Sequence, residues 1–320
     1  MGTTDRFTRI IVLRNPVSTN ASKTPQRIKE LQRACPHAVL TVIDTTAGGR
    51  TENTTVLAKH VAELGPHTLL CIAAGDGTVN LVAEALLTDV RFAGVAQQTP
   101  LLPLWCGNAN DLACMLNGLF HRTSLTHVLQ EGVVVPVWPL ESQLERAASM
   151  RRHIAICYTS FGASAFTAHW LGDTTRHAGM LHMIPGARFI KELVFVQQGL
   201  AKAQEFTIEE DGKQVVVYER VFLNGSRFAK VAGVPLRLNE KRFCMATVER
   251  KTFISLVLRA MQLTNRRYLE QFIRKQVAFL AQTPTWAQFD GEPLQVSAHT
   301  RITVGLADKP IYVLSTKLRK

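Results

Sequence analysis

A glycine-rich turn with one acidic residue stands at residues 75–78, where the sequence reads Gly-Asp-Gly-Thr. It follows an apolar run, residues 69–74, that predicts a strand, and the residues after it predict a helix. Glycine lets a backbone approach a ligand closely, and the first amides of a helix bind phosphate groups. The Asp76 carboxylate does not suit a site for anions alone, so it indicates a magnesium ion or a reacting hydroxyl nearby. An ordinary strand-to-helix turn capped by Asp76 is the alternative.

A second turn of the same construction occupies residues 107–111, with the sequence Gly-Asn-Ala-Asn-Asp after a predicted strand at residues 101–104. Two such turns from strands of one parallel sheet meet at its carboxyl edge, where open α/β sheets bind their ligands. Together, the two turns therefore predict a ligand site at this edge.

A third segment, Asp290-Gly291-Glu292, places two carboxylates beside a tight turn between predicted strands. Asp-Gly is also a common hairpin turn, and a plain hairpin is the alternative. Its position far downstream would allow a second domain to bring these carboxylates over the first.

The elements that must position these segments change in type along the chain. Up to residue 132, predicted strands alternate with helices, a pattern typical of a mostly parallel sheet with helices on its faces. We therefore expect an α/β domain at residues 1–132 and a β-rich, antiparallel, sandwich-like domain at residues 133–320. Its predicted strands are residues 133–140, 153–158, 206–209, 214–223, 243–248 and 294–304, with helical insertions at 187–203 and 252–281. A last strand at residues 311–315 belongs to either domain.

The composition is that of a folded protein with a basic balance. Hydrophobic residues make up 46% of the 320 residues and charged residues 19%, which disfavours disorder. The net charge of +12 suits an acidic partner such as a nucleotide or an anionic membrane surface, although it also favours solubility. The chain lacks a recognisable nucleic-acid motif, so we expect no DNA or RNA partner.

Several compartments and classes are disfavoured by the sequence. No apolar run approaches the roughly 18 residues of a spanning helix, and the first residues lack the pattern of a signal peptide. The six cysteines form no C-x-x-C pair and lie mostly in apolar segments, so neither disulfides nor a zinc site is expected. We expect a cytoplasmic protein, with peripheral contact at the inner face of the membrane.

The ordered set of motifs resembles the diacylglycerol kinase catalytic family, which includes sphingosine kinases and belongs to the NAD kinase-like superfamily. The resemblance covers nearly the whole chain. The matching segments are Asn15-Pro16-Val17-Ser18, Ala74–Thr78 followed by Asn80, Gly107–Ala113 and Asp290–Glu292, with weaker matches at Gly162 and Asn224.

This resemblance implies an ATP-dependent lipid kinase with Mg²⁺, whose acceptor is diacylglycerol, a sphingoid base or a similar lipid hydroxyl presented at a membrane surface. The acidic residues that it implies for magnesium and for the proton of the attacking hydroxyl are Asp76, Asp290 and Glu292. We expect Glu292 as general base and Asp76 near the phosphates and the metal, although the two roles are exchangeable. The nucleotide-binding residues that it implies are Asn15, Thr46, Gly75, Gly77, Thr78 and Asn80, with Gly107 and Asn110 on the opposite wall. The alternatives are a kinase of a soluble substrate, like the NAD kinases, and a non-catalytic binding relative.

The sequence departs from the family pattern at four places. Ala74 replaces a glycine directly before the turn at residues 75–78, and Thr19 replaces a glycine directly after Asn15–Ser18. Trp105, directly before the second turn, is expected to narrow the site. Residues 239–241, Asn-Glu-Lys, stand where bacterial members often carry an Asp-Asp-Gly stretch that holds a structural magnesium, so a second metal site is in doubt.

Overall fold

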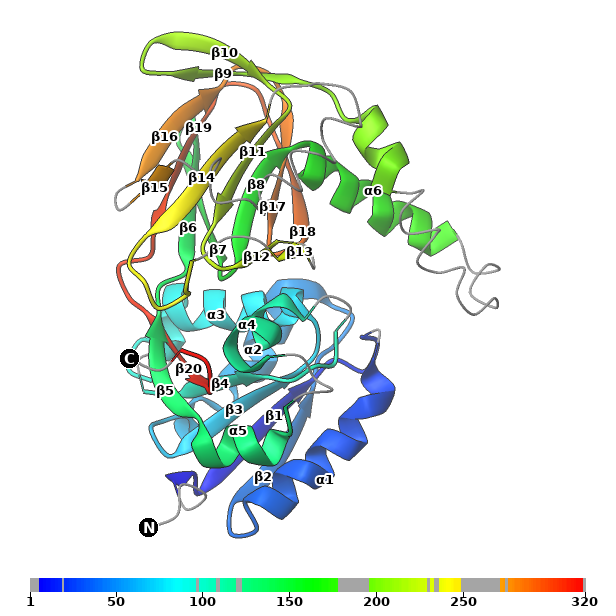
Figure 1. The fold of residues 1–320 in the computed structure, drawn as a ribbon, viewed down its shortest axis with the longest axis vertical. Helices are drawn as coiled ribbons and strands as arrows, with labels where there is room; N and C mark the ends of the chain where they lie inside the picture. Colours follow the sequence, from blue (N-terminus) through cyan, green and yellow to red (C-terminus); the bar gives the residue numbers. More distant parts are fainter. Residues whose placement is uncertain are drawn as a thin grey trace.

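The computed structural model describes residues 6–18, 20–95, 98–107, 110–118, 123–177, 196–228, 231–232, 236–248, 271–273 and 276–318 (Figure 1). Among these residues, no helix is both long enough and apolar enough to span a membrane. The chain forms two stacked units, a lower α/β unit that contains the N-terminus and an upper unit made almost entirely of strands (Figure 1).

The lower unit is built on a six-stranded sheet of order β2-β1-β3-β4-β20-β5. The strands β1 to β4 and β20 run parallel to one another, and β5 is antiparallel to β20. Its strands are β1 (Arg9–Arg14), β2 (Val39–Asp44), β3 (Thr68–Ala73), β4 (Pro100–Pro103), β5 (Val133–Val137) and β20 (Ile311–Ser315). Its helices are α1 (Thr24–Ala34), α2 (Gly49–Ala58), α3 (Asp76–Thr88), α4 (Asp111–Asn117) and α5 (Leu125–Glu131), with short 3-10 turns at Ala21–Lys23, Val61–Glu63 and Val90–Phe92.

The chain crosses between the two units twice. β5 still belongs to the lower sheet, so the chain leaves this sheet one strand after residue 132, and β20 returns to it from the far end of the sequence. Because β20 lies between β4 and β5, the C-terminal strand completes the sheet on which the predicted ligand loops stand.

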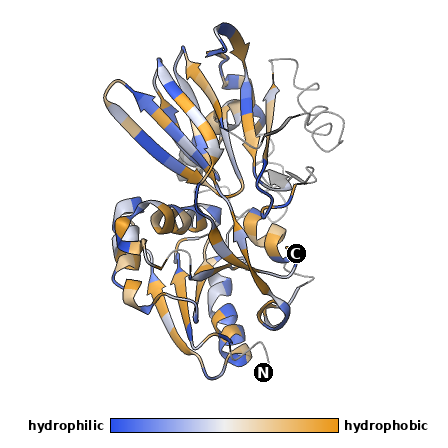
Figure 2. Cartoon of the chain, turned by 90° about the vertical axis from the view of Figure 1, so that its left-hand side faces the viewer, coloured by the Kyte–Doolittle hydropathy of each residue, from blue (hydrophilic) through white to orange (hydrophobic). Residues whose placement is uncertain are grey.

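Apolar side chains fill both faces of the lower sheet. One core packs β1 residues Ile11 and Leu13 with α2 and α3, and the other packs Ile10 and Val12 with α1 and α5. Strands that are buried on both faces are apolar throughout, and β3 is completely buried along its length. In Figure 2 the strands of this sheet are mainly orange, while those of the upper unit mix blue and orange.

The upper unit is a sandwich of two antiparallel six-stranded sheets, of orders β10-β9-β16-β19-β6-β7 and β15-β14-β11-β8-β17-β18, with a small β12–β13 ladder. Its core contains the rings of Phe161, Phe222 and Phe279, whose centroids lie 5.4–6.4 Å apart. The strands of the first sheet are β6 (Leu140–Arg146), β7 (Ser149–Ala155), β9 (Phe206–Glu210), β10 (Lys213–Val217), β16 (Val277–Ala281) and β19 (Thr300–Leu306). Those of the second are β8 (Tyr158–Gly162), β11 (Glu219–Leu223), β14 (Phe243–Val248), β15 (Gln271–Ile273), β17 (Thr285–Phe289) and β18 (Glu292–Val296), and the small ladder joins β12 (Arg227–Phe228) to β13 (Val231–Ala232).

The predicted fold class is confirmed, whereas several predicted elements are wrong in detail. Residues 133–140, 214–223 and 294–304 were each expected as one strand, but each contains parts of two strands that lie in different sheets. At the first break Pro139 supplies no N–H to a ladder, and the chain passes from the lower sheet into the sandwich.

The helical insertions differ as well. Of the predicted helix 252–281, residues 271–273 and 277–281 are strands instead, and residues 252–270 lie outside the described part of the chain. Of the predicted helix 187–203, residues 196–202 are helical and residues 187–195 are not described. A helix that the sequence did not indicate, α6 (Ala163–His177), packs against β17 and β18.

Candidate active site

The two glycine turns meet at the carboxyl edge of the lower sheet, between β3 and β4. Gly75 and Gly107 approach each other so closely that a Cβ on Gly107 would lie 2.2 Å from the Gly75 Cα. Residue 107 therefore needs glycine because backbone packs on backbone there, whereas a Cβ on Gly75 would make an ordinary contact, 3.5 Å from the Gly107 Cα. The predicted convergence of the two turns at one edge is what the fold produces.

Two asparagine side chains fix the backbone at residue 107 through hydrogen bonds. Asn110 adopts a left-handed backbone, with φ 54°, at the position before α4. Its side chain accepts a bond from the Gly107 N–H at 2.8 Å and donates to the Gly107 carbonyl at 2.7 Å. Asn20, from the loop after β1, donates to the same carbonyl at 2.6 Å. The loop after β1 is thus joined directly to the turn at residue 107.

Asp76 occupies the first position of α3 and faces the start of α4. Its carboxylate accepts bonds from the backbone N–H groups of Asp111, at 3.0 Å, and Leu112, at 3.4 Å. Burial, opposed by these hydrogen bonds and aided by the nearby carboxylates of Asp111 and Asp290, raises the pKa of Asp76 to about 7. A half-buried carboxylate beside two more acidic groups is a position where a cation would be stabilised.

Asp290 comes from the β17–β18 turn of the sandwich and is buried against the lower unit. Its carboxylate accepts bonds from three consecutive N–H groups, those of residues 156–158, at 2.5–2.9 Å. The Asn80 side-chain amide of α3 donates a fourth bond at 3.2 Å. Burial nevertheless raises the pKa of this carboxyl above its ordinary value. Both oxygens of Asp290 are thus engaged, and the bond from Asn80 links this turn of the sandwich to α3.

Glu292 begins β18 and is exposed. Its carboxylate lies over the first turn of α3, because a Cβ on Gly77 would stand 2.2 Å from Glu292 Oε1. The amides of the first helical turn have no partners within a helix. The structure thus places an exposed carboxylate of one unit directly against the glycine turn of the other.

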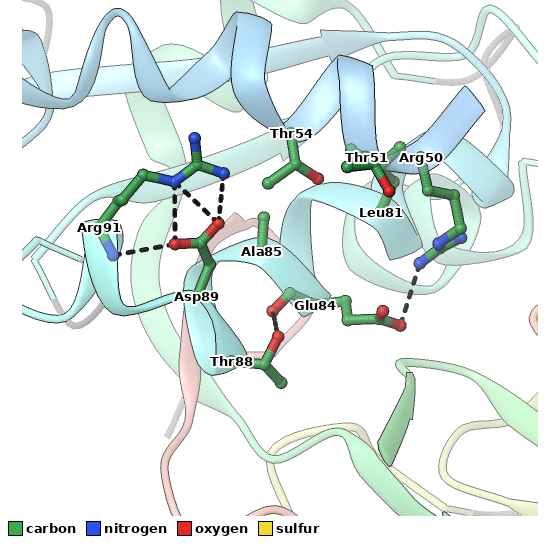
Figure 3. Close-up of a pocket in the computed structure, with 9 residues that line it drawn as sticks. All are labelled: Arg50, Thr51, Thr54, Leu81, Glu84, Ala85, Thr88, Asp89 and Arg91. Atoms are coloured by element: carbon green, nitrogen blue, oxygen red, sulfur yellow. Dashed lines mark hydrogen bonds and ion pairs between the residues drawn. The ribbon is translucent and has the colours of Figure 1, made fainter. Parts of the chain in front are cut away.

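Asn80 connects Asp290 to a charged group that the sequence did not single out. The Asn80 oxygen accepts a bond from Arg50 of α2 at 2.8 Å, and the same Arg50 nitrogen lies 3.0 Å from Glu84. Arg50 and Glu84 line one end of a cavity of about 220 Å³ between α2 and α3 (Figure 3). The Arg50 side chain is half-exposed. In the sequence, only its position four residues after the predicted site residue Thr46 indicated a role for it.

Tyr158 is the second residue that sequence reasoning missed. It starts β8, and its hydroxyl lies 3.8 Å from the position of a Cβ on Gly291. Burial raises the pKa of its phenol, as do the nearby carboxylates of Asp290, Asp111 and Asp76. Only the fold brings residue 158 to the Asp-Gly-Glu turn, so no local pattern could have found it.

The remaining predicted residues lie around the same edge. The Asn15 N–H bonds to the Ala73 carbonyl at 3.2 Å, which joins the ends of β1 and β3. Thr78 donates its N–H to the Gly75 carbonyl within the first turn of α3. Thr46 lies further out, in an exposed turn after β2 that Asn53 holds through the Thr46 N–H at 2.7 Å.

The structure answers the expectation about Trp105 and shows the contacts of residues 239–241. Trp105 is buried in the core and donates its indole N–H to the Gly118 carbonyl at 3.0 Å, so the expectation that it narrows the site is wrong. In the segment 239–241, Glu240 pairs with Arg242 at 2.6 Å and the Lys241 ammonium lies 4.5 Å from the centre of the Trp138 ring. Within the described ranges, no cluster of three or more His, Cys, Asp or Glu side chains is arranged to hold a metal ion.

Comparison with known proteins agrees with this geometry. Residues 9–137 match the family model for the diacylglycerol kinase catalytic domain. A crystal structure described as a diacylglycerol kinase from Bacillus anthracis str. Sterne aligns with a TM-score of 0.63 and 13% sequence identity over 97% of each chain. Another solved structure from the same organism aligns with a TM-score of 0.62 and 12% identity over 97% of this chain and 99% of the other. No curated protein sequence matches the chain.

The family predicted from the motifs is thereby confirmed. Residues 9–137 match this family as the motifs predict, and the solved structures share the two-unit fold of the chain. This match to a kinase family supports a phosphotransferase activity.

Proposed function

We propose that the protein transfers the γ-phosphate of ATP to a hydroxyl group of a lipid, with Mg²⁺. The observation that supports this most is the contact between Glu292 of the sandwich and Gly77 at the start of α3. An exposed carboxylate stands there beside a phosphate-type turn, where a hydroxyl that attacks the terminal phosphate would need a base.

The lower unit supplies the phosphate site in this proposal. The close approach of Gly107 to the Gly75 backbone brings the two turns together at the start of α3, whose dipole favours negative charge there. Asn15 and Thr46, at the ends of β1 and β2, stand where the rest of the nucleotide would extend.

The presence of a single carboxylate, that of Asp76, at the phosphate turn suits a magnesium ion. Mg²⁺ is usually held by one or two carboxylates together with substrate phosphates and water, not by an all-protein cage. One carboxylate at the phosphate turn, with no three-residue ligand cluster in the described part of the chain, matches that pattern. Bound there, the ion would neutralise phosphate charge during transfer.

Asp290 and Glu292, the two acidic residues of the Asp-Gly-Glu turn, have different roles in this proposal. Glu292 would take the proton from the acceptor hydroxyl, since its carboxylate is exposed at the turn. Asp290 would act as a positioning residue, because four donors already occupy its oxygens. This assignment replaces the expectation that all three acidic residues act on the reacting atoms.

The test is transfer of labelled γ-phosphate from ATP to acceptors offered in parallel. Mixed micelles would contain diacylglycerol or a sphingoid base, and plain buffer would contain NAD. We expect label in a lipid product and none in NAD. Label in NAD alone would establish a soluble acceptor, and absence of any transfer by a protein that binds ATP would contradict the proposal.

A further inference from the structure

An ion pair stands at the carboxyl ends of two adjacent strands. Arg14 is the last residue of β1, Asp44 is the last residue of β2, and the two are partners in register. The guanidinium donates to both carboxylate oxygens, Nε to Oδ1 and Nη2 to Oδ2, each at 2.6 Å. Both side chains remain accessible, with 34% of Arg14 and 48% of Asp44 exposed.

The pair lies beside the point where the strand order reverses. The chain runs outward from β1 to β2 and then returns to β3 on the other side of β1, with order β2-β1-β3. Ligands of open α/β sheets bind outside the carboxyl ends of strands at such a point. Adjacent strands are about 4.8 Å apart, so Asp44 lies two spacings, roughly 10 Å, from the end of β3. A nucleotide whose phosphates lie at the β3 turn would extend over this distance.

The chemistry of the pair suits a sugar more than a phosphate. Arg14, through its hydrogen bonds, holds the pKa of the Asp44 carboxyl below its ordinary value. Each carboxylate oxygen still has a lone pair free for another donor. In dinucleotide-binding folds, whose phosphates lie at the turn after the first strand, a carboxylate further along the chain accepts a ribose hydroxyl, and Asp44 offers the same chemistry beside the β3 turn.

We propose that the Arg14–Asp44 pair is the ribose-recognition element of the nucleotide site, and that it makes the protein prefer ribonucleotides over 2′-deoxyribonucleotides. The inference rests on the proposed function, since it takes ATP as the bound nucleotide. Asp44 accepts the hydrogen bond of the sugar hydroxyl, and Arg14 is the positioning residue that orients the carboxylate.

The experiment compares binding of ATP and 2′-deoxyATP to the full chain by titration calorimetry, with Mg²⁺ and without acceptor. A hydrogen bond to a charged group corresponds to about a tenfold change in affinity. We expect the wild type to bind ATP about tenfold more tightly than deoxyATP, and Asp44→Asn to reduce this ratio to about threefold or less.

A matched control exists in the same unit. Asp89 and Arg91 form another forked ion pair, partly exposed, directly after α3 (Figure 3). Asn caps a helix as well as Asp, so Asp89→Asn is expected to leave the ratio of the two affinities unchanged. A second variant, Arg14→Lys, keeps the charge but loses the fork, and its ratio should fall between those of the wild type and Asp44→Asn.

The outcomes separate the two proposals. A wild type that binds both nucleotides equally, or variants at residues 14 and 44 that keep the wild-type ratio, would overturn the ribose assignment while ATP binding still supports the proposed function. A change of the ratio in Asp89→Asn as large as in Asp44→Asn would overturn it too. If neither nucleotide binds, the proposed function itself fails.

Discussion

Replacement of Asp290 by Asn removes one carboxylate oxygen and leaves the shape of the side chain unchanged. Oδ1 accepts the N–H groups of Cys157 and Tyr158, each at 2.9 Å, and Oδ2 accepts those of Ile156, at 2.5 Å, and the Asn80 side chain, at 3.2 Å. An amide nitrogen on either side therefore faces two donors and cannot accept from them. A buried donor without a partner costs about 1–3 kcal/mol, so two of them lower the free energy of unfolding by about 2–6 kcal/mol.

The backbone conformation at residue 290 adds no cost of its own when Asp is replaced by Asn. Asp290 has φ 51°, and Asn tolerates the left-handed region as well as Asp does. A loss of this size should lower the melting temperature of the chain by about 3–9 °C, measured by calorimetry.

The matched variant Glu292→Gln changes an exposed residue of the same turn in the same way, and its melting temperature should stay within about 2 °C of the wild type. If the two variants melt at the same temperature, the claim that Asp290 fastens the sandwich to α3 is refuted. If Asp290→Asn is as stable as the wild type yet inactive, Asp290 acts on the reacting atoms instead.

The buried carboxyl of Glu219, which accepts bonds from the Ser164 N–H and hydroxyl, has a pKa raised to about 7 by burial. The unfolded chain loses this proton near its ordinary pKa of about 4.3, so stability falls as the pH rises from there to 7 and then levels off, by up to about 3 kcal/mol. Urea denaturation of Glu219→Gln should show a smaller fall than the wild type, because the raised pKa of Asp76 remains, and a pH profile parallel to that of the wild type would contradict the assignment. Gly107→Ala would set a Cβ 2.2 Å from the Gly75 Cα, so we expect a loss of about 1–3 kcal/mol and at least tenfold weaker ATP binding, whereas Gly94→Ala, with nothing within 4 Å, should change neither.

The sequence predicted the lower unit well because its signals are local. Short apolar runs such as residues 69–74, ended by glycine turns, determine both the strands and the edge where the turns meet. The contact of Gly75 with Gly107 follows from this topology, since parallel strands place their following turns side by side.

The sandwich was predicted less well because one continuous strand-like segment of the sequence forms two strands that belong to different sheets. Nothing in the composition of residues 214–223 or 294–304 marks the break, which only pairing partners determine. The roles within the third motif were hidden for a similar reason. Asp290 and Glu292 are equivalent as sequence letters, and the N–H groups of residues 156–158, far away in the chain, distinguish them.

The measurement that tests the central claim most directly is transfer of labelled phosphate from ATP to lipid by the wild type and by Glu292→Gln, together with ATP affinity for both. The account predicts a labelled lipid from the wild type, at least a hundredfold slower transfer by Glu292→Gln, and ATP affinity within about threefold in the two proteins. Transfer by Glu292→Gln at the wild-type rate would contradict the assignment of Glu292 as the base, and a wild type that binds ATP but labels no lipid would contradict the lipid-kinase proposal.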